Sequence, residues 1–119
     1  REITMVVLRF KDGVRVHTLD TQLLPGLLSL CQMMEEVLGL REVWITSVNE
    51  GVHKRLSLHY FGQAVDIRTK PYPRDKVQQV LDGFKRFYDR EYDLIWENKN
   101  LPAEHFHLEF DPGNKNTGG

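Results

Sequence analysis

The sequence predicts one α+β domain, in which a mainly antiparallel sheet carries helices packed on one face. Short stretches rich in strand-forming residues recur along the whole chain, and two longer segments repeat apolar residues at helical spacing. No internal repeat or linker divides the 119 residues, and a chain of this length with 40% hydrophobic residues suits a single core. We expect the domain to span residues 1–112 and residues 113–119 to form a disordered tail.

The N-terminal segment predicts a hairpin followed by a helix. Residues 3–10 read as a strand, and Asp12 and Gly13 supply a tight turn before a return strand at residues 14–18. Residues 25–40 predict a helix, because leucines and other apolar residues recur there on one broad stripe.

The end of this helix and the segment after it are also readable. Gly39 is suited to stop the helix, since glycine accepts the left-handed backbone found at helix ends. The single cysteine, Cys31, falls within the apolar stripe, which predicts a buried thiol. Residues 43–47 predict a short buried strand, and the polar residues 49–56 predict a loop.

The second half of the chain begins with a strand at residues 64–68. On a strand, Asp66 and Arg68 share one face while Val65 and Ile67 point to the other, so the aliphatic pair enters the core and Asp66 turns towards a cleft. The remaining predicted elements are a helix that follows Pro73 and reaches Tyr88, and strands at residues 92–96 and 105–110.

The charge balance argues against two classes of partner and leaves open only a local basic patch formed by Lys54, Arg55, Arg68, Lys70 and Arg74. Sixteen basic residues against 17 acidic ones leave a formal net charge of -1, which gives no field to attract nucleic acid or an anionic membrane. The chain has no secretory apolar region and no apolar run long enough to cross a bilayer. We therefore expect no nucleic-acid partner and no membrane span.

Two histidine-containing stretches carry the chemistry. His59 and Asp66 lie seven residues apart, and some forty residues later His105 and His107 share one face of a predicted strand, with Glu104 just upstream. Imidazole and carboxylate groups of this kind are the parts of a mononuclear zinc site. The spacing also permits rival ligand sets, such as the three histidines without Asp66, and does not choose between them.

The string Ser57-x-His59-x-x-Gly62-x-Ala64-x-Asp66, together with Glu104-x-x-His107, resembles the signature of zinc D-Ala-D-Ala carboxypeptidases and dipeptidases. That superfamily also includes the L-alanyl-D-glutamate endopeptidases of phage lysins and the hedgehog signalling domain. The resemblance covers roughly residues 43–110 and implies a hedgehog/DD-peptidase-like fold. It assigns the three zinc ligands to His59, Asp66 and His107 and the catalytic base to Glu104. It also implies that His105 polarises the substrate and that Ser57 supports the site through its hydroxyl.

The resemblance implies a zinc-dependent metallopeptidase that hydrolyses peptidoglycan stem peptides with a metal-activated water. The bond would be of the D-Ala-D-Ala carboxypeptidase type or the L-Ala-D-Glu type. We expect the protein to be a monomer that acts on the cell wall. It would do so in the periplasm, outside the cell or as part of a phage lysin.

One departure favours an alternative. The peptidases usually carry an arginine in the segment that corresponds to residues 46–51, and this chain has none there. Arg55 and Arg68 are the candidates to bind substrate in its place, with Lys54 a third cation nearby. Hedgehog domains also lack that arginine, so the alternative is a non-catalytic, hedgehog-like zinc module that binds a protein partner.

Overall fold

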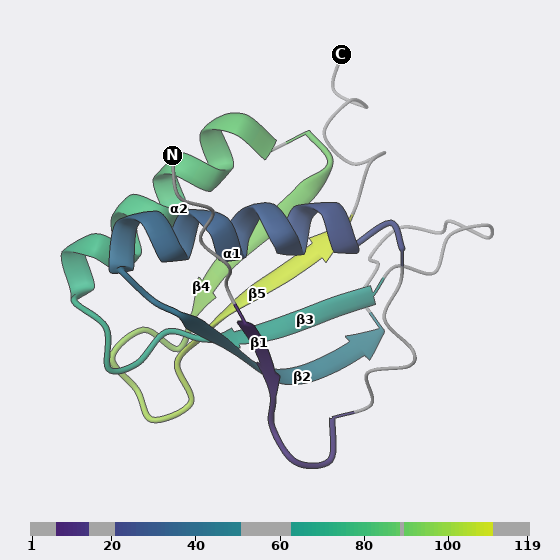
Figure 1. Cartoon of the computed structure of the whole chain (residues 1–119), viewed down its shortest axis with the longest axis horizontal. Helices are drawn as coiled ribbons and strands as arrows, with labels where there is room; N and C mark the ends of the chain where they lie inside the picture. The colour runs from purple at the N-terminus through teal and green to yellow at the C-terminus, as the bar shows by residue number, and fades with distance from the viewer. Residues whose placement is uncertain (1–6, 15–20, 51–62, 89, 111–119) are drawn as a thin grey trace.

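The computed structural model describes residues 7–14, 21–50, 63–88 and 90–110 (Figure 1). Within these ranges, neither helix combines the length and the apolar content that crossing a membrane requires. In chain order, the elements are β1 (Val7–Phe10), α1 (Leu24–Leu38), β2 (Glu42–Glu50), β3 (Gln63–Arg68), α2 (Arg74–Tyr88), β4 (Tyr92–Glu97) and β5 (His105–Phe110).

The five strands form one sheet in the order β1-β2-β3-β5-β4. The small single α+β domain expected from the sequence is confirmed, but the sheet is mixed. β1 runs parallel to β2, because α1 connects them as a crossover, while the other three pairings are antiparallel. The predicted return strand lies outside the described residues, except for Val14, which belongs to no strand.

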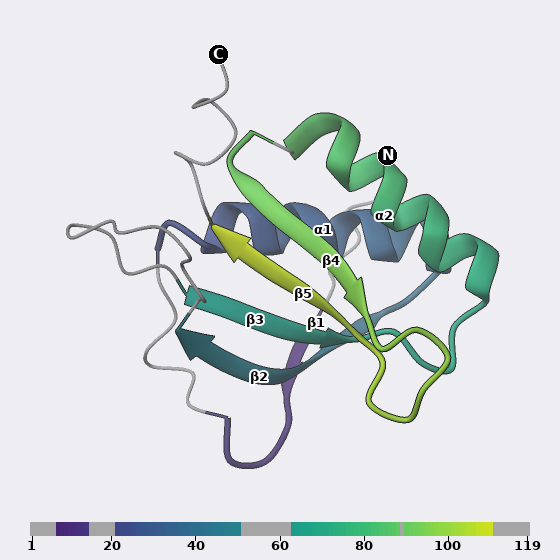
Figure 2. The ribbon, with the colours of Figure 1, turned by 180° about the vertical axis from the view of Figure 1, so that it is seen from behind.

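The core lies between the helices and one face of the sheet. Val65 and Ile67 of β3 are fully buried and face Leu108 and Phe106 of β5 in register, as the apolar alternation in both strands requires. Side chains from α1 and α2 complete the same apolar cluster. Seen from behind, strands β2, β3 and β5 have no helix in front of them (Figure 2), so the residues that alternate with the core positions face outward.

The predicted ends of the elements mostly hold. Gly39 caps α1 with a φ of 71° and donates its N–H to the carbonyl of Glu35 at 2.9 Å. Cys31 is buried, and burial raises the pKa of its thiol to about 12. The predicted loop beginning at Asn49 is wrong by two residues, because pairing with β3 extends β2 through Glu50 despite the polar sequence.

Gly26 marks a close approach between α1 and β4. A Cβ atom built at this position would lie 2.4 Å from the ring of Tyr92, so only glycine fits there without movement of that ring. The hydroxyl of Tyr92 accepts the N–H of Gly26 and donates to the carbonyl of Gln22. This contact ties the start of α1 to the strand that carries part of the site.

Candidate metal centre

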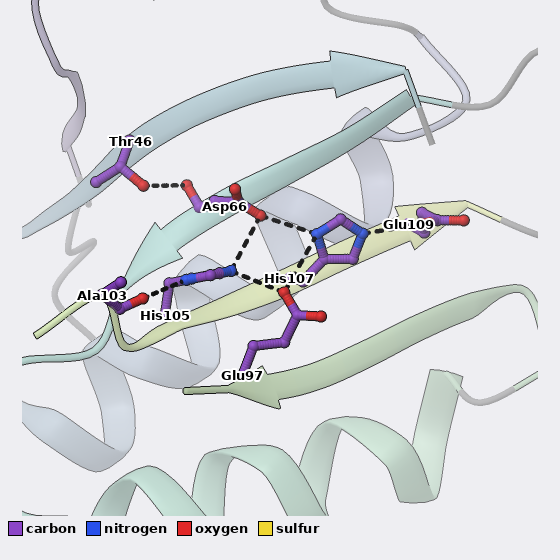
Figure 3. Close-up of polar contacts among 7 residues, drawn as sticks. All are labelled: Thr46, Asp66, Glu97, Ala103, His105, His107 and Glu109. Carbon is purple, nitrogen blue, oxygen red and sulfur yellow. Dashed lines mark hydrogen bonds and ion pairs between the residues drawn. The ribbon is translucent and has the colours of Figure 1, made fainter. Parts of the chain in front are cut away.

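The outward face of β3, β4 and β5 gathers histidines and carboxylates. Asp66 of β3 is the cross-strand partner of His107 on β5, and Glu97 at the end of β4 is the partner of His105. Because residues two apart on a strand share a face, His105 and His107 project to the same side (Figure 3). We call Asp66, Glu97, His105 and His107 the open-face cluster.

The polar atoms of the open-face cluster converge. The Oδ1 atom of Asp66 lies 2.8 Å from Nδ1 of His107 and 3.6 Å from Nε2 of His105. The Oε1 atom of Glu97 lies 2.8 Å from Nε2 of His105 and 4.0 Å from Nδ1 of His107. One ligand atom from each of the four residues lies within 4.8 Å of the others, so the cluster could hold a single metal ion.

The electrostatics favour a cation at this place. Hydrogen bonds with Asp66 and Glu109, the latter 2.9 Å from Nε2, raise the pKa of His107 to about 10 although partial burial acts in the opposite direction. Asp66, Glu97 and Glu109 are three carboxylates, and in the described part of the chain no Lys or Arg forms an ion pair with them. Negative charge therefore exceeds positive charge around the two imidazoles.

The ring of His105 gives a test of whether a metal fits. Its Nδ1 lies 2.7 Å from the carbonyl of Ala103, which can only accept, so a neutral ring carries its proton on that nitrogen. Its Nε2 then presents a lone pair to the acceptor oxygens of Glu97 and Asp66. A cation among these atoms would satisfy all three. Two imidazoles with carboxylates are a donor set typical of zinc and other transition metals, and they do not identify which metal binds.

The structure brings together three of the residues predicted for the site: Asp66, His105 and His107. His59, Ser57 and Arg55 lie outside the described residues, so their predicted roles stay predictions.

Two members of the site were missed from the sequence. Glu109 follows His107 at the same-face spacing of two, a signal that was available. Glu97 directly follows the predicted strand 92–96, but its place opposite His105 depends on the β4–β5 register, which spacing alone does not give.

Glu104 lies just before β5, directly upstream of His105, but its carboxylate has partners outside the open-face cluster. Arg74 and Thr69 donate to it through their side chains, and Asn100 donates its backbone N–H at 2.8 Å. Burial raises the pKa of the Glu104 carboxyl, and these hydrogen bonds outweigh that effect and lower it to about 2. The carboxylate is not among the four groups of the open-face cluster, so its role as catalytic base stays a prediction.

Arg68 lies on the same face as the open-face cluster. It pairs in register with His105, and its side chain is exposed, with the guanidinium carbon 4.9 Å from the ring centroid of Trp44. A cation at this position borders the cluster without neutralising it.

Comparisons with known proteins identify no relative: no protein-family model, no curated protein and no solved structure matches the chain.

Proposed function

We propose that the protein is a zinc-dependent metallopeptidase that hydrolyses peptide bonds of bacterial peptidoglycan stem peptides. One observation carries the proposal. Asp66 and His107, two of the three ligands that the resemblance implies, are 41 residues apart in the chain but are partners on adjacent strands. Oδ1 of Asp66 lies 2.8 Å from Nδ1 of His107. Their convergence is what the two motifs require if they form one site.

The remaining ligand positions have two candidate solutions. The resemblance adds His59, whereas the geometry of the described residues offers His105 and Glu97. Either set supplies oxygen and nitrogen atoms that are suitable ligands for zinc. A bound zinc ion would supply Lewis-acid chemistry, polarising a carbonyl and making water acidic enough to react near neutral pH.

Hydrolysis also needs a carboxylate that takes a proton from the attacking water and returns it to the leaving amine. The resemblance gives this role to Glu104, which would first have to separate from Arg74. If His59 completes the ligand set, Glu97 is not needed as a ligand and is the other candidate for the base, since its carboxylate lies in the open-face cluster and its side chain is 43% exposed. Replacing each in turn by glutamine discriminates between them: only the base should be indispensable for turnover while zinc remains bound.

Substrate binding would fall to the exposed cation beside the cluster. Arg68 could bind a carboxylate or carbonyl oxygen of a stem peptide, the role for which the segment 46–51 lacks an arginine. Arg55 stays the second candidate for this role.

The decisive experiment incubates the zinc-loaded protein with purified peptidoglycan and identifies the released fragments by mass spectrometry. We expect fragments whose masses correspond to one type of cleaved stem-peptide bond, and none from the Asp66→Ala variant. Intact peptidoglycan after incubation with a protein shown to contain one zinc ion would contradict the hydrolase.

A second function is favoured by the surroundings of Glu104. Because Arg74, Thr69 and Asn100 already occupy its carboxylate, the protein could instead be a non-catalytic, hedgehog-like zinc module that binds a protein partner. It would then bind zinc stoichiometrically and cut no peptide even at high protein concentration.

A further inference from the structure

Glu109 holds the side of the His107 ring that faces away from the open-face cluster. Its Oε1 atom lies 2.9 Å from Nε2 of His107, while the other ring nitrogen, Nδ1, lies 2.8 Å from Asp66 (Figure 3). Both contacts arise from the sheet itself. Glu109 shares its strand face with His107, and Asp66 is the cross-strand partner of His107.

The burial of Glu109 makes this contact more than a surface ion pair. The residue is only 8% exposed, and no Lys or Arg of the described ranges forms an ion pair with it. A buried carboxylate is costly unless a donor satisfies it, and among the described residues the ring N–H of His107 is the donor that reaches Glu109. The carboxylate therefore favours ring states of His107 that carry a proton on Nε2.

The two ring nitrogens of a histidine are thereby given different tasks. A neutral imidazole has one N–H and one lone pair, and the hydrogen bond made by one nitrogen decides which nitrogen is free to bind a metal. With Nε2–H donated to Glu109, the lone pair is on Nδ1, which is the nitrogen beside Asp66 and 4.0 Å from Glu97.

We propose that Glu109 is a positioning residue of the metal site, which fixes the Nε2–H form of His107 and thereby presents Nδ1 to the ion. This inference rests on the metal binding proposed above and not on peptide hydrolysis. Glu109 touches neither the ion nor the substrate in this arrangement, and it acts only through His107. Carboxylates that hold a ligating imidazole in this way typically contribute about 10- to 100-fold to metal affinity.

The first test reads the protonation of the ring directly. Nitrogen-15 spectra of the imidazole in the zinc-loaded wild-type protein should show His107 with a protonated Nε2 and a metal-bound Nδ1. A spectrum in which Nε2 binds the metal would overturn the proposal without need of any variant.

The second test measures zinc affinity by competition with a chelating dye. Glu109→Ala should lose about 10- to 100-fold in affinity. Glu109→Gln should recover part of the loss, because its amide oxygen still accepts the Nε2–H. Glu91→Ala, which removes an exposed carboxylate outside the site, should bind zinc like the wild type.

The outcomes separate the two proposals. Equal affinity in Glu109→Ala and wild type, or no recovery in Glu109→Gln when both variants are folded, would overturn the positioning role. Zinc binding without peptide cleavage would overturn only the hydrolase, and the role of Glu109 would stand. A wild-type protein that binds no zinc would overturn both.

Discussion

Two neighbouring residues, Glu104 and His105, belong to two polar clusters of opposite character. Glu104 is bound by Arg74, Thr69 and the N–H of Asn100, a group that we call the Glu104 clamp. In the clamp one carboxylate meets one guanidinium and further donors, so its charge and hydrogen bonds are satisfied. In the open-face cluster carboxylates outnumber the cations that the chain supplies. The comparison indicates that the clamp is complete within the protein, whereas the open-face cluster has the donor atoms that could hold a metal ion.

The two clusters also differ in how they contact the rest of the protein and the solvent. Arg74 also donates to the carbonyls of Thr69 and Tyr72 at 3.0 and 2.9 Å, so the clamp joins the end of β3 to the start of α2 and to the turn before β5. The side chains of Asp66 and His107 are 18% and 17% exposed, which leaves the open-face cluster in reach of solvent and ions. We therefore expect the clamp to stabilise the fold and the open-face cluster to carry function.

The largest expected effect is the loss of stability when the clamp is broken. Glu104→Ala leaves the buried hydroxyl of Thr69 and the partly exposed guanidinium of Arg74 without their acceptor, and it should lower the free energy of unfolding by about 3 kcal/mol. Asp66→Ala, measured beside it without metal, should cost less, because Asp66 and His107 are each partly exposed and Glu109 still accepts a hydrogen bond from His107. Urea denaturation in the presence of a chelator measures both. Equal losses would remove the distinction between the clusters.

The second largest expected effect is the loss at acid pH of the stability that the Glu104 clamp contributes. The pKa of Glu104 is lowered from 4.5 to about 2, so its contribution to stability is complete above pH 4.5 and is lost as the pH falls towards 2. The difference corresponds to roughly 3 kcal/mol over that window. Thermal unfolding between pH 6 and pH 2.5 should show a steeper loss in the wild type than in Glu104→Gln. Parallel curves would contradict the lowered pKa.

Zinc should stabilise the protein through the open-face cluster and not through the Glu104 clamp. At a free zinc concentration about 100 times the dissociation constant, the free energy of unfolding should rise by about 2.7 kcal/mol. His107→Ala should abolish the rise in thermal stability, and Glu104→Gln should retain it. A rise that persists in His107→Ala would place the metal elsewhere.

The smallest expected effect is the pH dependence of zinc binding. The pKa of His107 in the metal-free protein is raised to about 10, so its Nδ1 must release a proton when a metal binds. Below pH 10, affinity should therefore increase with pH, by about tenfold per unit if one proton is released. Calorimetric titrations at pH 6, 7 and 8 measure the slope. An affinity independent of pH would show that His107 does not exchange its proton for the metal.

The sequence predicted the parts of the fold that depend on local pattern. The alternation around Asp66 placed Val65 and Ile67 in the core, and the leucine stripe gave α1 with its stop at Gly39. The parallel pairing of β1 with β2 was missed, because partners far apart in sequence leave no local signal.

The site divides in the same way. Asp66, His105 and His107 were predicted, because alternation along a strand determines which face of the sheet each of them occupies. The partners of Glu104 were not, since the motif gives no information about an arginine 30 residues away. The contribution of Glu97 depends on the register of a hairpin, which only the folded sheet defines.

Metal analysis of the purified protein tests the central claim most directly. After incubation with zinc and exhaustive dialysis, the wild type and Glu104→Gln should each retain one zinc ion per chain, and Asp66→Ala and His107→Ala should retain none. A wild type free of bound zinc, or full occupancy in the folded His107→Ala variant, would contradict a metal centre on the open face of the sheet.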